Sequence, residues 1–140
     1  MRTFSIIFIL VFAIWQIPMA QTVSSANHRI VFQLTDGQTD AHIKFLRQLN
    51  NILEAAPNAQ LAVVTHGMGV DLLRTENNDL EKELVKLKDM GVEFIVCQNT
   101  MKQRNLQQSY FLAWISYVPS AILEIVTRQE KGWSYIKAGS

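Results

Sequence analysis

The chemistry that this chain can do centres on Cys97, the only cysteine in its 140 residues. Cys97 closes an apolar run that begins at Val92, and a polar, helix-starting segment follows it at once. If the run is a strand of a parallel sheet, Cys97 lies at the carboxyl end, where open α/β sheets bind their ligands. The N-terminus of a helix just beyond would favour thiolate over thiol. Cys97 is therefore a candidate nucleophile or sulfur carrier; the alternative is a small buried apolar side chain.

His66 is the histidine best placed to assist this thiol, because it directly follows a second apolar run, 61–65. It could act as an acid or base, or hold the thiolate as an ion pair. The alternative is a loop histidine that is hydrogen-bonded to the backbone. His28 precedes the first predicted strand and so lies at the opposite edge of the sheet. His42 is expected on the exposed side of a helix. We therefore predict that Cys97 and His66 are the catalytic residues.

Small, acidic and amide-bearing residues follow the predicted strands and complete the candidate site. Because the carboxyl ends of parallel strands share one edge of a sheet, these residues should gather there, together with Pro119 and Ser120. Backbone amides just after Cys97 would stabilise an anion on its sulfur. The predicted ligand-binding residues are Asp36, Gly37, Gly67, Gln98, Asn99 and Thr100.

The sequence predicts neither a metal nor a cofactor. Cys97, His66 and Asp36 could supply three ligands, but the spacings CxxC, HxxxH and HExxH do not occur. Gly67 and Gly69 begin a dinucleotide fingerprint, yet the third glycine is missing. A tight turn explains these two glycines better than a dinucleotide-binding site does.

Strand-like and helix-like segments alternate along the chain. Continuous apolar runs predict strands over 28–34, 61–65, 92–97, 114–118 and 133–136. Helical spacing predicts helices from Thr39 or Asp40 to 56, from Asn77 or Asn78 to 90, from Asn99 to Asn105, and from Ser120 to about 131, with a helical turn over 70–74. This alternation predicts a three-layer α/β/α domain with a mainly parallel five-stranded sheet, whose strand order stays open.

The N-terminus has the pattern of a secretory signal peptide over residues 1–26. A positive charge at Arg2 precedes an apolar stretch and then small residues, which predicts cleavage after Ala20 or after Ala26. An uncleaved anchor is the alternative, although the stretch is short for a membrane-spanning helix. Residues 27–140 then form one domain, exported to the periplasm. Removing residues 1–26 takes away only Arg2 and lowers the formal net charge from +1 to 0, so no nucleic-acid or membrane partner is expected.

An aromatic cluster over 110–114 precedes the fourth predicted strand. It belongs either to the core or to an interface between subunits, and the sequence does not distinguish the two.

The mature chain resembles the DsrE/DsrF-like family. The resemblance rests on 28–37, 46–53, 63–67, the Cys97-Gln98-Asn99-Thr100 stretch, and the Gly132-Trp133-Ser134-Tyr135-Ile136-Lys137 ending. It implies a parallel five-stranded α/β fold and assembly into homo-oligomers, commonly dimers, trimers or hexamers. It also implies sulfur relay with a donor or acceptor protein, in which a cysteine after a central strand carries sulfane sulfur as a persulfide. Cys97 occupies such a position. The signal peptide departs from the cytoplasmic relay partners of the family.

Two hypotheses follow for the function. The first is a sulfur-relay protein, at most a sulfurtransferase-like carrier, that holds a persulfide on Cys97. The second is a non-catalytic oligomeric module that binds a small ligand and uses Cys97 only for packing. The solvent exposure of Cys97 and its relation to His66 are the observations that bear most on the choice.

Overall fold

A computed structural model describes residues 22–139 of the chain. The predicted signal peptide falls mostly on residues 1–21, outside the described residues. In chain order the elements are β1 (Arg29–Leu34), α1 (Thr39–Ala55), β2 (Gln60–Thr65), the 3₁₀ helix η1 (Gly67–Leu73), α2 (Glu81–Asp89), β3 (Glu93–Cys97), α3 (Gln98–Gln103), the 3₁₀ helix η2 (Gln108–Tyr110), β4 (Ser116–Val118), α4 (Ala121–Glu130) and β5 (Ser134–Ala138). No helix in this part of the chain is long and apolar enough to cross a membrane.

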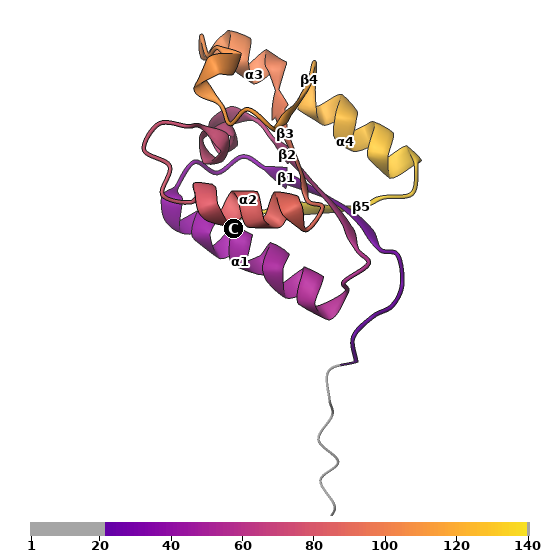
Figure 1. Ribbon diagram of the computed structural model, residues 1–140. Helices are drawn as coiled ribbons and strands as arrows, with labels where there is room; N and C mark the ends of the chain where they lie inside the picture. Colours follow the sequence, from indigo (N-terminus) through magenta and orange to yellow (C-terminus); the bar gives the residue numbers. More distant parts are fainter. Residues whose placement is uncertain (1–21, 140) are drawn as a thin grey trace, which may run out of the picture.

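The five strands form one sheet in the order β4-β3-β2-β1-β5, and every neighbouring pair is parallel. Helices α1 and α2 cover one face and α4 covers the other, while α3 lies beyond the end of β3 (Figure 1). The predicted three-layer α/β/α class is therefore confirmed. The strand order, which the sequence left open, places β1 between β2 and β5 and puts β3 next to an edge strand.

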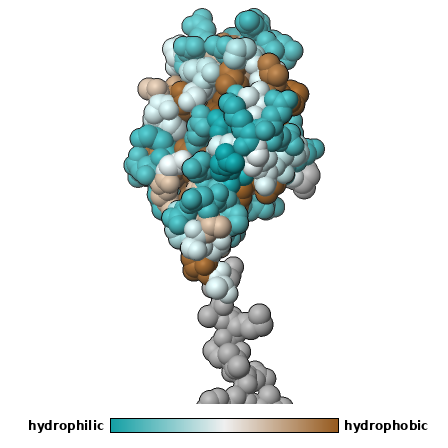
Figure 2. Space-filling view, turned by 90° about the vertical axis from the view of Figure 1, so that its right-hand side faces the viewer, coloured by the Kyte–Doolittle hydropathy of each residue, from teal (hydrophilic) through white to brown (hydrophobic). Residues whose placement is uncertain are grey.

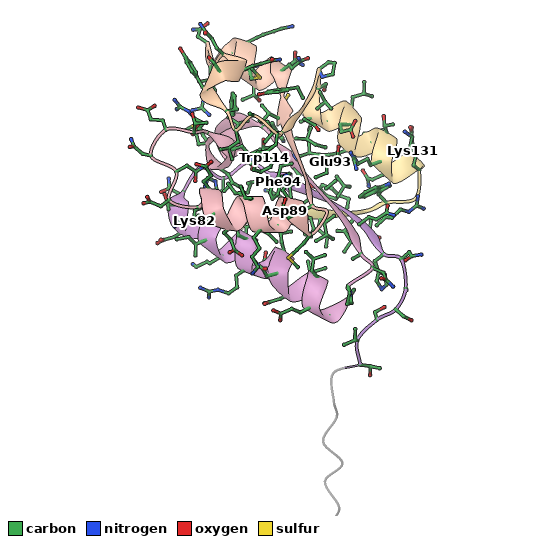
Figure 3. The ribbon with its side chains drawn as sticks, viewed as in Figure 1. Lys82, Asp89, Glu93, Phe94, Trp114 and Lys131 are labelled. Atoms are coloured by element: carbon green, nitrogen blue, oxygen red, sulfur yellow. The ribbon has the colours of Figure 1, made fainter. Side chains whose placement is uncertain are left out.

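The central strands are buried on both faces, which explains their continuous apolar runs. Along β3, Phe94 faces the α1–α2 side, where its ring lies 5.8 Å from that of Trp114. Glu93 points the other way, toward α4 (Figure 3). It accepts a hydrogen bond of 2.6 Å from Arg128 of that helix. By the same alternation Cys97 lies on the α4 face, packed in a cluster with Ala121 and Ile125.

Helix α1 begins at Thr39, as predicted; its N-cap is Gln38, which makes no side-chain cap, and Asp36 accepts from the amide of Gln38 at 2.8 Å. The predicted start of α2 is wrong. Helix α2 begins only at Glu81, because Asn78 bonds the amide of Leu80 and so shapes a turn before the helix. Helix α4, predicted from Ser120, begins at Ala121 with Ser120 as its N-cap, and Ser120 Oγ accepts from the amide of Leu123 at 3.4 Å.

Two further expectations are decided by burial. His42 is only 4% exposed, and its Nε2 lies 2.7 Å from the backbone oxygen of Asp36, so the exposed position expected for it is wrong. The turn before α1 places the backbone carbonyl of Asp36 within reach of the imidazole, so the buried ring has a hydrogen-bond partner. In the aromatic cluster, Phe111 and Leu112 are buried in the core, which confirms the core interpretation for these two residues.

Candidate functional site

Cys97 is the last residue of β3 and also the N-cap of α3, which begins at Gln98. The sequence placed this helix start one residue later, at Asn99. The earlier start matters because the first amides of a helix have no partners within it and point at the N-cap side chain. Cys97 is 4% exposed and lies beneath the first turn of α4.

The sulfur of Cys97 is surrounded by hydrogen-bond donors. The N–H of Ala121, the first residue of α4, donates to Sγ at 3.3 Å. Burial is the largest single influence and raises the pKa of Cys97. The amides of Thr100, Ala121 and Asn99 and the hydroxyl of Thr100 together outweigh burial, so the pKa of Cys97 lies below its ordinary value, although Sγ makes no cap hydrogen bond to α3. The site therefore favours an anion on sulfur without a cationic side chain.

Thr100 links the thiol to the loop after β2. Its Oγ1 accepts a hydrogen bond of 3.0 Å from the backbone N–H of Gly67. A hydroxyl that accepts from one group keeps its own hydrogen for another, and the Thr100 hydroxyl is among the groups that lower the pKa of Cys97. Thr100 is 4% exposed, so its hydroxyl is shielded from water. Of the predicted ligand-binding residues, Gly67, Asn99 and Thr100 are thus brought to Cys97.

Helix α3 and η1 are fastened to each other by Arg104. Its Nη1 donates to the backbone oxygen of Gly67 at 3.0 Å, and its Nη2 donates to both carboxylate oxygens of Asp71, at 3.0 and 3.1 Å. The guanidinium therefore positions the loop, and it is not among the groups that lower the pKa of Cys97.

The glycines of this loop serve a tight turn, as predicted, and also allow close packing. Gly67 has φ +58, a left-handed conformation that glycine adopts without strain. A Cβ on Gly69 would lie 2.2 Å from the backbone oxygen of Leu34, so only glycine fits against the end of β1.

His66 continues β2 in extended conformation, with φ −152 and ψ 173. The β2–β3 register pairs Thr65 with Val96, so its continuation places His66 beside Cys97. The imidazole is nevertheless bonded elsewhere: its Nε2 lies 2.7 Å from the side-chain nitrogen of Gln33 on β1. Burial lowers the pKa of His66, which is half-buried and neutral at neutral pH. His66 and Cys97 are neighbours along the sheet, but they do not form an ion pair.

Gln33 is a site residue that the sequence interpretation missed. It is the one polar residue in the apolar run Ile30-Val31-Phe32-Gln33-Leu34 of a central strand. A polar side chain inside such a run needs a hydrogen-bonding partner, and that requirement was the available signal.

Asp36, Gly37 and Gln98 lie outside the group around Cys97. Asp36 and Gly37 form the turn from β1 to α1, where Gly37 packs against Met68. Gln98 lines an open depression of about 720 Å³ with Met101, Lys102 and Leu106. Within residues 22–139, no three histidine, cysteine or carboxylate side chains gather as they would around a metal ion.

Comparison with known proteins identifies relatives of the whole domain. The family model for the DsrE/DsrF-like family matches residues 28–138. No curated protein matches the chain.

Three solved structures share the fold. MTH1491, a protein of unknown function from Methanobacterium thermoautotrophicum, is 26% identical with a TM-score of 0.75, over 79% of this chain and 99% of its own. The ychN protein from E. coli is 13% identical with a TM-score of 0.63, over 80% and 99%. BT1422 from Bacteroides thetaiotaomicron, also of unknown function, is 13% identical with a TM-score of 0.60, over 81% and 97%. The latter two likenesses concern the fold alone.

Proposed function

The chain belongs to the DsrE/DsrF-like family, and on that premise we propose that it is a sulfur-relay protein that carries sulfane sulfur as a persulfide on Cys97. The observation that carries the proposal is the set of donors around Sγ, of which the Ala121 N–H is hydrogen-bonded to it at 3.3 Å. The amides of Asn99, Thr100 and Ala121 and the hydroxyl of Thr100 keep the pKa of Cys97 low although the thiol is buried. A cysteine that only fills space needs no such donors, whereas an anionic sulfur does.

The transfer needs no added oxidant or reductant. With thiosulfate as donor, the Cys97 thiolate attacks the outer sulfur, the S–S bond of thiosulfate breaks, and sulfite leaves with the electron pair. The product is Cys97–S–S⁻, and the total charge is the same on both sides. With a persulfide donor, the leaving group is the donor's thiolate. The donors that stabilise the Cys97 thiolate then lie next to the terminal sulfur anion.

Access to Cys97 requires movement of the segment before α4. The thiol is 4% exposed, and two hydrogen bonds close the segment over it: Asn99 N–H to Pro119 O at 3.3 Å, and Ala121 N–H to Sγ. Opening these two bonds exposes the sulfur without disturbing the sheet. Once closed, the segment shields a persulfide from oxidants, which suits an exported protein.

The burial of Cys97 also favours the alternative, a small-ligand-binding module with a structural cysteine. One experiment separates the two functions. The purified protein is incubated with thiosulfate or polysulfide, and its intact mass is measured before and after reduction. Because Cys97 is the only cysteine, a reducible gain of one sulfur atom locates the persulfide there. The matched control is Cys97→Ala, which keeps an apolar side chain and removes the sulfur. A folded wild-type protein that gains no sulfur would support the alternative.

We further propose that the protein assembles into a homo-oligomer through the outer side of α4. Three apolar side chains are exposed there: Ile122 at 55%, Leu123 at 64% and Val126 at 41%. The right-hand side of Figure 1, where α4 ends, faces the viewer in Figure 2, and its surface is mainly hydrophilic with separate apolar spots. An exposed apolar row on one helix is typical of a surface that another protein chain covers.

Export to the periplasm is also proposed, with cleavage after Ala20. Ser24 N–H donates to the oxygen of Ala55 at 2.7 Å, and Ser24 Oγ lies 2.8 Å from His28 Nε2. Cleavage after Ala26 would remove both contacts, whereas cleavage after Ala20 keeps them. The mass of the mature chain recovered from the periplasm tests the site.

A further inference from the structure

A row of polar side chains crosses the α4 face of the sheet near its carboxyl end. Tyr135 of β5 is paired in register with Val31 of β1, and Gln33 lies two residues beyond Val31, so both side chains emerge on the face of Val31. That face also carries Cys97. His66 completes the row, because the continued β2–β3 register places it beside Cys97.

The hydrogen bonds along this row have one direction. The phenol of Tyr135 donates to Gln33 Oε1, and the amide nitrogen of Gln33 faces His66. That nitrogen, Nε2, lies 2.7 Å from Nε2 of His66. An amide NH₂ can only donate, so the imidazole nitrogen facing it must accept. A neutral imidazole that accepts at Nε2 carries its proton on Nδ1.

Two observations support a neutral imidazole with a free Nδ1–H. His66 is half-buried, and burial lowers its pKa. Among residues 22–139, Gln33 is the one side chain that hydrogen-bonds the His66 ring, so Nδ1–H remains available.

We infer that Gln33, oriented by Tyr135, is a positioning residue that fixes His66 with its proton on Nδ1, so that His66 meets anionic sulfur at Cys97 as a hydrogen-bond donor. The tautomer depends on the three side chains alone, whereas the role toward sulfur rests on the proposed persulfide. A protonated Nδ1 has no lone pair with which to remove a proton. The thiolate is therefore favoured by the surrounding amides, and His66 is a donor to the anion and not its base.

Nitrogen NMR of the histidine rings tests the tautomer. His42 provides an internal reference, since its Nε2 faces a backbone oxygen, which can only accept, and must therefore be protonated. At neutral pH we expect opposite tautomers: Nε2 protonated in His42 and Nδ1 protonated in His66. Tyr135→Phe should bring the other His66 tautomer into the spectrum, because the Gln33 amide is then free to turn over. Tyr110→Phe is the matched control, as both tyrosines are 40% exposed.

A protonated Nε2 on His66 in the wild-type protein would overturn the tautomer. An unchanged spectrum in Tyr135→Phe would overturn the part assigned to Tyr135. Neither result depends on whether Cys97 accepts sulfur.

Sulfur loading of Cys97 from thiosulfate tests the donor role. His66→Gln keeps an N–H donor but loses the ability to act as a base, whereas His66→Leu loses both the donor and the base. We expect His66→Gln to load faster than His66→Leu, and His66→Leu to load roughly tenfold more slowly than the wild type, as expected for the loss of one hydrogen bond to a charged group. Equal rates in the two variants would overturn the donor role and leave the tautomer standing. A wild-type protein that takes up no sulfur would instead contradict the proposed function, and the NMR result would still decide the tautomer.

Discussion

The backbone N–H of Gly67 donates a hydrogen bond of 3.0 Å to Oγ1 of Thr100, and through that hydroxyl the loop after β2 reaches the sulfur of Cys97. The bond connects two segments that are 33 positions apart in the sequence. It fixes the direction of the hydroxyl hydrogen, and with it one of the groups that lower the pKa of the thiol. The thiol therefore depends on a contact between two loops as well as on the start of α3.

Thr100→Val should raise the pKa of Cys97, because the variant keeps the shape of the side chain and loses the hydroxyl donor. It also leaves the Gly67 amide without its acceptor, at a cost of about 1–2 kcal/mol in the free energy of unfolding. The pH dependence of thiolate absorbance gives the pKa, and urea unfolding gives the stability. Thr127→Val on α4 is the matched control. An unchanged thiol pKa would show that the amides alone stabilise the thiolate.

The stability of the protein should fall as the pH drops below about 6.5, the ordinary pKa of histidine. The pKa of His66 is lowered in the folded state by burial. Below that pH the unfolded chain therefore binds a proton that the folded chain does not, which favours unfolding. Above it both states are neutral and His66 has no effect. Urea unfolding across this range should show a shallower decline in His66→Gln, with His28→Gln as the control. Parallel declines in the wild type and His66→Gln would refute the expectation.

Gly69→Ala should destabilise the protein by about 2–3 kcal/mol, since an added Cβ would lie 2.2 Å from the backbone oxygen of Leu34. Gly91→Ala is an instructive comparison. Gly91 has φ +93 but no atom within 4 Å of an added Cβ, so only backbone strain opposes the change, at about 1 kcal/mol. Thermal unfolding of both variants measures the difference. If Gly91→Ala were the more damaging change, the contact between η1 and β1 would be looser than described.

Leu123→Asp should dissociate the proposed homo-oligomer without reducing the stability of the subunit, because this side chain is 64% exposed. Light scattering coupled to size-exclusion chromatography gives the mass of the assembly. Met90→Asp, at the end of α2 on the opposite side of the sheet and 45% exposed, is the matched control. Equal masses for the wild type and Leu123→Asp would exclude the α4 surface as the interface.

The sequence predicted the fold class well because buried parallel strands leave a direct trace in the chain. Runs such as 61–65 are too continuously apolar for any other position in an α/β domain, and the structure has a strand at Gln60–Thr65. Helix caps were harder to predict. At α1 and at α2 a side chain bonded a turn amide before the helix, and capping patterns cannot distinguish that arrangement from a cap.

The candidate site was predicted only in part. Cys97, Gly67 and Thr100 come together because they follow neighbouring strands. Asp36 follows β1, and its carboxylate caps the turn there. The contribution of Gln33 depends on which strand lies beside β2 and on which way an amide is turned. Both are tertiary properties that no local pattern in the chain contains.

One consequence follows from the position of Ala121, which is both a donor to Cys97 Sγ and the first residue of α4. A persulfide adds one S–S bond of about 2 Å to the thiol, so the first turn of α4 rests differently on a loaded cysteine than on an empty one. Linkage is reciprocal. A partner that binds α4 and holds it in one of these positions changes the affinity of Cys97 for sulfur by some factor, and sulfur on Cys97 changes the affinity of α4 for that partner by the same factor. A partner on α4 would therefore distinguish the charged carrier from the discharged one without touching the sulfur.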